Sequence, residues 1–350
     1  RRALPGMLPE ALSRLHSITV DNTILSGSTD SAYAEFRIYN HVGRIEGKAG
    51  IRFTGDMAYS ADITTHGLDL SPILDSPDMK SEIDSRIVVR GRGTDPEKAT
   101  AELRIESNNS YIQNINYNTL IFKANVADGS IIMDTTAVEF MIPDIPDYLE
   151  QENPGFFASG SFTLTGERPS YSIDSKFNGL DIASITGADN APEYITGRIK
   201  ADGEGLDPDK IDGKVVLNID YALFGDRAMM PFDLALNMEQ LDSMRKKLTL
   251  ESEFMDATLS GNFTFNQLVP TLQTQGEYLV QYFEKRMSSV NPEMFSERDT
   301  AETIRLGSFP DFEFDLRARI NDISSLSLLA DSLNMYINAN IGLRMTSAGD

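Results

Sequence analysis

The stretch "HGLDLSPI" at residues 66–73 returns as "NGLDIASI" at residues 178–185, which is 112 residues further along the chain. The same offset, without a gap, aligns "GRGTDPEK" at 91–98 with "GEGLDPDK" at 203–210. One ungapped offset over about forty positions is typical of an internal repeat. The chain of 350 residues is therefore predicted to be built from copies of one structural unit.

A third, looser copy, "RINDISSL" at 319–326, indicates that the repeat continues toward the end of the chain. There Asp315 lies 141 residues after its counterpart Asp174, and the extra length falls in a stretch near 268–308 whose pattern is helical. The repeats predict four parts: a leading helix and strands over 1–58, a first unit over 59–170, a second unit with the helical insert over 171–311, and the start of a third unit over 312–350.

Within each unit the dominant hydrophobic period is two. In "FEFDLRARI" at 312–320 apolar residues alternate with charged ones, and "YSIDSKF" at 171–177 behaves similarly. This alternation is typical of antiparallel strands with one wet face and one apolar face. The predicted fold class is mainly β: an elongated, curved antiparallel sheet of repeated units that forms an apolar groove, with a few short helices and a helical insert near 268–308.

The repeated phrase has a physical interpretation. Gly67 and Gly179, each at the end of a strand, permit a bulge or a positive φ. Ser71 or Asp181 can then cap a short helical turn. Each unit is therefore expected to run from a strand through a turn of helix into the next strand.

The Asp-Pro pairs at 95–96 and 207–208 suit the first two positions of a type I turn, so equivalent hairpin loops are predicted there. The G-x-G before each pair is not interpreted as a phosphate loop, because such a loop needs a helix after it and here a strand follows. The acidic stretch at 202–213 is rich in oxygen ligands but lacks the spacing of a calcium loop, which favours a plain acidic loop.

Composition narrows the functional classes. The chain has no cysteine and a formal net charge of −22, which excludes disulfides and thiolate sites and argues against binding to nucleic acid. The three histidines, His16, His41 and His66, are far apart in the sequence, and no pair of carboxylates is singled out. We therefore predict a protein that is not an enzyme and that has no cofactor and no metal site.

No stretch approaches the roughly 20 apolar residues that cross a bilayer, and the sequence begins without Met and ends within a strand pattern. We expect it to be part of a longer protein whose targeting or anchoring segment lies outside it. The stretch at 270–289 has apolar residues on one helical face. It is interpreted either as a helix packed on the sheet or as a lid over an apolar groove or an interfacial helix.

The pattern G-L-D-[LI]-x-x-[IL], followed by I-x-G-x-[IL]-x-x-x-G-x-G…G, resembles the repeats of the AsmA-like superfamily, and most closely those of its TamB-type translocation and assembly proteins. The resemblance is carried by "FNGLDIASI…ITGRIKADGEGLDPDKIDGKVVLNI" and "ASGSFTLTG"; it covers most of 50–265 and resumes at 312–350. Ser85 departs from it, because the family pattern has glycine there, and the insert at 268–308 is also unusual.

The resemblance implies a periplasmic protein of a Gram-negative-type bacterium, anchored to the inner membrane by a segment outside this sequence. It implies a β-taco groove that serves phospholipid transfer between the inner and outer membranes. The implied partners are phospholipid or another acyl-chain lipid and an outer-membrane assembly protein. The alternative is a periplasmic scaffold or chaperone that assists outer-membrane protein or envelope complex assembly through strand addition or docking.

Candidate groove residues follow from the repeat and from the period of two, which together place each strand's apolar residues on one side of a curved sheet. An acyl chain lying along such a face gains about 0.8 kcal/mol per buried methylene. The same faces could instead cover each other in a two-sheet sandwich, so groove and sandwich both stay open. The candidate residues are Ile83, Ile87, Val89, Leu103, Ile105, Ile195, Ile199, Ala201, Val215, Leu217, Ile219, Phe314, Leu316, Ile337, Ile341 and Leu343.

Overall fold

The computed structural model describes residues 19–95, 97–113, 115–141, 154–163, 165–166, 168–186, 191–205, 207–225, 227–229, 231–265, 268, 313–321 and 339–346. These residues belong to two compact units. The first unit holds the described parts of 19–204 and 214–234, and the second holds those of 205–213, 235–321 and 339–346. The leading helix, predicted near 8–15, and the insert near 268–308 apart from Leu268 lie outside the described residues.

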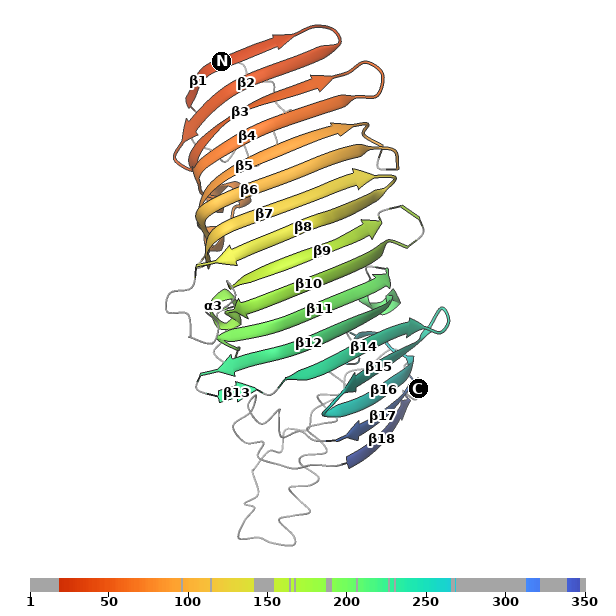
Figure 1. Cartoon of the computed structure of the whole chain (residues 1–350). Coiled ribbons are helices and arrows are strands. Elements are labelled where there is room, and N and C mark those ends of the chain that lie inside the picture. The colour runs from red at the N-terminus through yellow and green to blue at the C-terminus, as the bar shows by residue number, and fades with distance from the viewer. Residues whose placement is uncertain are drawn as a thin grey trace, which may run out of the picture. The chain divides into compact units, whose positions relative to one another are not determined.

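The first unit is an antiparallel sheet in which each strand from β1 to β11 pairs with the next one along the chain (Figure 1). The mainly β, antiparallel fold class is confirmed. The strands are β1 (Thr19–Gly27), β2 (Ser31–Asn40), β3 (Gly43–Arg52), β4 (Ala58–Leu68), β5 (Ser81–Arg92), β6 (Thr100–Ile112), β7 (Ile115–Ala127), β8 (Ser130–Phe140), β9 (Gly155–Thr163), β10 (Ser170–Leu180), β11 (Tyr194–Glu204), β12 (Asp212–Phe224) and β13 (Arg227–Met229).

The second unit contains four strands that also pair in chain order, after β14 (Phe232–Gln240), which begins in the first unit and ends in the second. They are β15 (Arg245–Ser252), β16 (Met255–Asn262), β17 (Glu313–Ile320) and β18 (Ala339–Thr346). A compact core lies on one face of these strands and comprises Leu259, Phe263, Leu268 and Phe314. The Phe263 ring meets the Phe314 ring edge to face, with centroids 6.3 Å apart.

The repeat is confirmed by strand register, because residues paired between β4 and β5 have counterparts 112 positions later that are paired between β10 and β11. Both copies place a tyrosine opposite a glycine and an aspartate beside an arginine that binds it through two nitrogens. These pairs are Tyr59–Gly91 and Asp62–Arg86 in the first copy, and Tyr171–Gly203 and Asp174–Arg198 in the second. The boundaries of the four predicted parts stay predictions.

The predicted strand-end glycines behave identically in both copies. Gly67 and Gly179 have φ of 56°, and a register shift marks each position as a bulge. Their N–H groups donate hydrogen bonds to side chains of the next strand, at 2.8 Å to Asp84 Oδ1 and at 3.0 Å to Thr196 Oγ1. A residue with a Cβ atom is strained at such a φ, so glycine is required by the backbone itself.

Short helices follow the bulges, namely α2 (Ser71–Leu74) with the 3-10 turn η1 (Pro77–Met79) in the first copy and α3 (Ile182–Thr186) in the second. Asp181 caps α3 as predicted, accepting a hydrogen bond from the Ser184 N–H at 2.9 Å. Ser71 does not cap α2. Instead Asp69 accepts from both the N–H and the hydroxyl of Ser71, because a carboxylate is the stronger acceptor.

The two predicted hairpin loops are equivalent. Asp95 and Asp207 each accept a side-chain hydrogen bond from the N–H two residues later, at 3.1 and 3.0 Å. Each main-chain carbonyl also accepts from the N–H three residues later, at 3.0 and 2.8 Å. The turn prediction is confirmed at both aspartates, while Pro96 lies outside the described residues.

The third copy keeps the faces of the sheet but changes the register. Asp315 lies opposite Arg344, whereas its counterpart Asp174 lies opposite Lys200, whose own counterpart is Gly342. The pairing of β17 with β18 is therefore displaced by two residues from that of β10 with β11. Because side chains alternate with a period of two, a displacement of two leaves the apolar set on one face.

The turn between β14 and β15 makes stability depend on pH. The N–H groups of Met244 and Arg245 and the Arg245 Nε donate hydrogen bonds to Asp242 at 2.8–2.9 Å, which lowers the pKa of Asp242 from 3.8 to about 2. A depressed folded-state pKa contributes stability above pH 3.8 that is lost as the pH falls toward about 2. In thermal melts across this range, Asp242→Asn should lose part of the acid sensitivity, whereas Ser243→Ala, an exposed position in the same turn without a titratable group, should keep it. Identical pH profiles for both variants and the wild type would contradict this assignment.

Candidate functional site: the apolar face

Strand register sorts the side chains of the first unit onto two faces. On one of them a row runs from Ile63 of β4 through Ile87 and Ile105 to Phe122 of β7, each opposite the next. The adjacent row on the same face holds Ala61, Val89, Leu103 and Ala124. This surface, made by these two rows and their continuation below, is termed the apolar face.

Both rows continue across the middle of the sheet. The first passes from Phe122 through Thr136, Ala158 and Ser175 to Ile199 of β11. On β12, Ile219 belongs to a buried cluster against which Leu217, Ile195 and Ile199 pack. The first two predicted sets of groove residues therefore lie on one face of the first unit. The second row continues through Met133, Gly160 and Ile173 to Ala201.

The opposite surface, termed the polar face, is dense in ion pairs. Glu46 receives Arg44 at 2.6 Å and Arg37 at 3.0 Å, and these two arginines lower the pKa of Glu46. Asp62 is bound in the same way by Arg86 at 2.7 Å. Such exposed pairs contribute little to stability, but they mark this face as the solvated one.

The apolar face is only half covered. Ile87, Val89, Leu103 and Ile105 are half-buried although all four lie on inner strands, and Ile173 is 37% exposed. A two-sheet sandwich would bury them, but the described strands of this unit form one sheet, paired in chain order. An apolar surface left this open calls for an occupant or a cover.

A hollow of about 620 Å³ lies at the first strands of this surface. This volume is in the range of small-molecule pockets. The hollow exists because Ala34, Ala49 and Ala61 lie opposite one another on successive strands, where larger side chains would fill the space. Its lining includes Leu25, Ala34, Ala49, Ile51, Tyr59, Ala61 and Val89.

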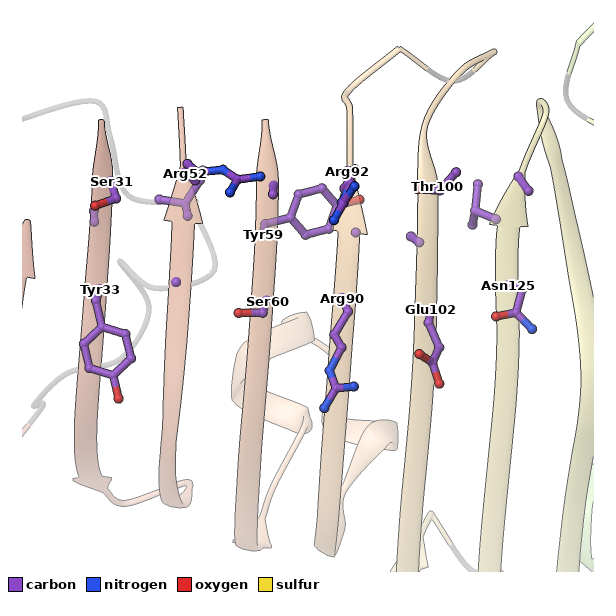
Figure 2. Close-up of a pocket in the computed structure, with 18 residues that line it drawn as sticks. Ser31, Tyr33, Arg52, Tyr59, Ser60, Arg90, Arg92, Thr100, Glu102 and Asn125 are labelled. Atoms are coloured by element: carbon purple, nitrogen blue, oxygen red, sulfur yellow. The ribbon is translucent and has the colours of Figure 1, made fainter. Parts of the chain in front are cut away.

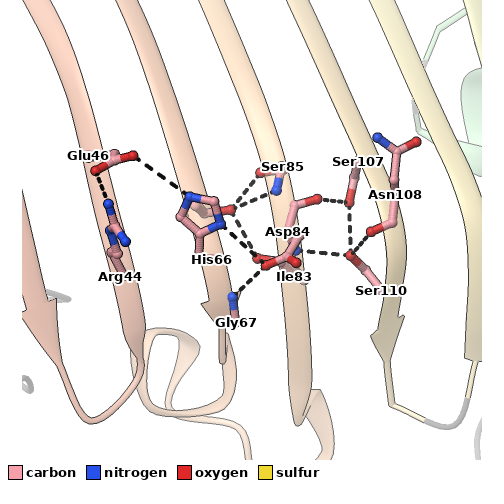
Figure 3. Close-up of polar contacts among 11 residues, drawn as sticks. Arg44, Glu46, His66, Gly67, Ile83, Asp84, Ser85, Ser107, Asn108 and Ser110 are labelled. Atoms are coloured by element: carbon pink, nitrogen blue, oxygen red, sulfur yellow. Dashed lines mark hydrogen bonds and ion pairs between the residues drawn. The ribbon is translucent and has the colours of Figure 1, made fainter.

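Toward the bulged ends of β4–β7, the apolar face contains a buried polar network of Thr65, Ser85, Ser107, Ser110 and Tyr117. Figure 3 shows three of its members, Ser85, Ser107 and Ser110. The hydroxyl oxygens of Thr65 and Ser85 lie 2.8 Å apart, and Ser107 Oγ lies 3.0 Å from the Tyr117 hydroxyl and 3.2 Å from Ser110 Oγ. Ser107 also donates to a main-chain carbonyl of β5 at 2.7 Å. Each buried hydroxyl thus has a partner, as burial requires.

In the second repeat the same five positions hold apolar residues or glycine: Phe177, Gly197, Ile219, Ala222 and Met229. Four of them form a buried cluster. A Cβ at Gly197 would lie 3.0 Å from the Phe177 ring and 2.2 Å from a main-chain oxygen of β12. This explains the departure at Ser85, since Ser85 faces Thr65 where Gly197 faces the larger Phe177.

The network is expected to behave as one unit. Tyr117→Phe removes one of the three hydrogen-bond partners of Ser107, a serine that is 2% exposed, so it should lower the free energy of unfolding by about 0.5–1.5 kcal/mol. Tyr111→Phe, on the neighbouring half-buried position of β6, should change it by less than about 0.5 kcal/mol. Urea unfolding measures both, and equal effects of the two variants would show that the hydroxyl network contributes nothing.

The predicted groove residues differ in how far they reach the surface. Ile83, Ile219 and Phe314 are at most 9% exposed, so their side chains are buried. Ile337 lies outside the described residues. Half-buried are Ile87, Val89, Leu103, Ile105, Ile195, Ile199, Ala201, Val215, Leu217, Leu316 and Leu343, while Ile341 is 44% exposed.

In the second unit, Leu316 lies opposite both Leu259 and Leu343, and Ile341 lies opposite Ala318. The third predicted set therefore shares one face of that unit. That this face continues the groove of the first unit stays a prediction.

Sequence reasoning missed a buried lysine on this face of the second unit. Lys246 lies opposite Gly261, is 8% exposed, and makes an ion pair of 2.7 Å with Asp209. Its Nζ lies 5.2 and 5.4 Å from the ring centres of Phe263 and Phe265. Burial acts to raise the pKa of Asp209, but hydrogen bonds from Lys246 and the Phe265 N–H keep that pKa below its usual value.

Comparisons with protein-family models, curated proteins and solved structures found no match for this chain. Among the described residues, no helix has the length and apolarity needed to cross a membrane. In that same part of the chain no group of three or more His, Asp or Glu residues is arranged to hold a metal ion.

Proposed function

We propose that the apolar face lines a groove that carries the acyl chains of phospholipid between the inner and outer membranes, in an AsmA/TamB-like periplasmic protein anchored to the inner membrane outside this sequence. The resemblance of the repeats to that family supplies the location and the cargo. The proposed role is binding and transfer, so it needs no catalytic residue and no cofactor.

One observation carries the proposal: two mainly apolar rows, interrupted by Thr136 and Ser175, cross eight consecutive strands, and most of their residues are half-buried. At about 4.8 Å per strand these rows extend over roughly 34 Å, which is close to the thickness of a bilayer's hydrocarbon core. At about 0.8 kcal/mol per buried methylene, even a partly enclosed acyl chain gains several kcal/mol along such a row.

The test is a photo-crosslinking residue placed on either face of one strand. Leu103 belongs to the apolar face, and its neighbour Arg104 points to the polar face, where it contacts Glu106. Crosslinking to phospholipid is expected from position 103 and not from position 104. Mass spectrometry of organic extracts of the purified wild-type chain should find the same lipid. Absence of lipid from both experiments would refute the proposal.

A scaffold role remains the second candidate, because β1 presents an apolar edge strand. Val20, Ile24 and Leu25 are 56, 58 and 76% exposed, and the described residues place no strand beyond β1. The strand also lacks the lysine or proline that usually blocks an edge. If a partner adds a strand here, Ile24→Pro should abolish its binding while lipid crosslinking from position 103 persists.

A further inference from the structure

Three arginines gather on the polar face where β3 and β5 end (Figure 2). Arg52 and Arg92 lie opposite the same residue, Ala58, one on each side of it. Arg90 belongs to the adjacent row, between Ser60 and Glu102. Because strands are about 4.8 Å apart, the backbones of Arg52 and Arg92 are separated by about 10 Å. This group of Arg52, Arg90 and Arg92 is termed the arginine corner.

Among the described residues the arginine corner has no close counter-ion, although Arg90, after the hydrogen bonds from Arg86, helps to lower the pKa of Asp62. Arg52, Arg90 and Arg92 form no ion pair within 4 Å with any residue that the structure describes, although the chain carries a formal net charge of −22. Asp62, in the next row, is already held by two hydrogen bonds from Arg86, at 3.0 and 2.7 Å. Elsewhere on the same face the arginines are matched with carboxylates, as at Glu46.

The space between these arginines is hollow, with a volume of about 780 Å³. Ala58 and Gly50, small residues at the centre of the two rows, leave room between the longer side chains. Hydrogen-bonding groups surround it, namely Ser31, Tyr33, Ser60, Thr100 and Asn125. Glu102 is the carboxylate that lines it.

The fold does not require arginine at these places. In the second repeat the counterparts of Arg90 and Arg92 are Asp202 and Glu204, and the strands there pair in the same register. The positive charge is therefore peculiar to the first repeat, while the backbone is common to both.

We propose that the arginine corner is a binding site for a phosphate group. The planar guanidinium binds two phosphate oxygens at once through parallel N–H groups, which makes arginine the side chain best suited to this anion. Two such side chains flank a gap, a third lies one row further along, and hydroxyl and amide groups complete the hollow. The site lies on the polar face and does not depend on lipid occupying the apolar face. The phosphate belongs either to a free phosphate compound or to a lipid headgroup.

The test compares a charge-reversing variant with a matched control. Arg90→Asp/Arg92→Glu installs the residues of the second repeat and should weaken phosphate binding at least about tenfold. Glu102→Gln removes the carboxylate from the hollow and should tighten binding about twofold to threefold. The control, Lys210→Glu/Arg317→Glu, changes the net charge by the same four units at side chains that are 75 and 79% exposed, and should bind like the wild type.

Two probes separate the sources of the phosphate. Inorganic phosphate is titrated and followed by phosphorus NMR, and phosphatidylglycerol vesicles are compared with phosphatidylcholine vesicles by flotation. Binding of inorganic phosphate with the stated order of variants supports a free phosphate ligand. Recruitment by phosphatidylglycerol vesicles alone, with the same order, supports a lipid headgroup. Failure of the wild type to bind either probe, or equal loss in the control, would overturn the proposal. Circular dichroism confirms that the variants are folded.

Discussion

Val89→Asp is expected to abolish lipid crosslinking from position 103, whereas Val88→Asp, one residue earlier, is expected to leave it intact. Val89 lies opposite Ala61 and Leu103 on the apolar face, so its carboxylate would stand in the acyl-chain path. Val88 lies opposite Asp62 and Arg104 on the polar face. The two variants make the same chemical change on the same strand and differ only in the face that they alter.

Stability provides the second measurement on the same pair. Val89 is half-buried, so a carboxylate at this position keeps part of its hydration. Val89→Asp should therefore lower the free energy of unfolding by less than about 2 kcal/mol. A closed core would lose about 3 kcal/mol or more for an unpaired buried charge. Persistent crosslinking in a folded Val89→Asp protein would exclude the groove as the lipid path. Collapse of the fold, with no lipid in the wild type, would favour a covered face.

Position 89 is a better choice than Ile199 and Leu217, although the sequence points to those residues equally. Both pack against the buried cluster that contains Phe177 and Ile219, so a charge there would disturb a core as well as a groove. Loss of transfer in such variants could result from unfolding alone. The sequence repeat equates positions in the two copies, but it does not reveal that one copy is more deeply covered than the other.

The repeat, the faces and the turns could be predicted from sequence because each depends on local chemistry. Gly67 adopts a positive φ, and the Asp95 carboxylate accepts a hydrogen bond from the Glu97 N–H within the same turn. Both features depend on only a few neighbouring residues in the sequence. The alternation does not mark the apolar residues of β8, because Asp134 interrupts it. Lys123 pairs with Thr135 and Ala124 with Met133, so Asp134 is an extra residue that shifts the period by one.

Features made by residues distant in the chain could not be predicted in this way. The exchange of the Thr65–Ser85 pair for Phe177–Gly197 becomes meaningful only when the strands are seen to pair. Lys246 occupies a place on β15 that alternation assigns to the apolar side of that strand, where a charged residue contradicts the pattern. Its partner comes from a loop 37 residues earlier, which no local pattern indicates.

Asp209→Asn is expected to lower the free energy of unfolding of the second unit by about 3 kcal/mol, because it leaves the ammonium of Lys246 buried without a counter-charge. The amide oxygen of asparagine can still accept from the Phe265 N–H, so the change isolates the ion pair. Lys246→Met should cost less than about 1 kcal/mol, since an apolar side chain can pack on the Phe263 and Phe265 rings and Asp209 remains partly hydrated.

The order of the two effects distinguishes a buried ion pair from a surface contact, in which both variants would cost equally little. Asp207→Asn, in the same loop, is the control; its side chain is 51% exposed and asparagine preserves the turn. In urea unfolding, the double variant Asp209→Asn/Lys246→Met should be about as stable as Lys246→Met alone. Without the lysine there is no buried ammonium group that needs the carboxylate as a counter-charge. The double variant therefore recovers most of what Asp209→Asn loses, and additive losses would show that the two residues do not act on each other. The counterpart of Asp209 in the first repeat is the exposed Glu97, so Glu97→Gln should leave the free energy of unfolding of the first unit unchanged.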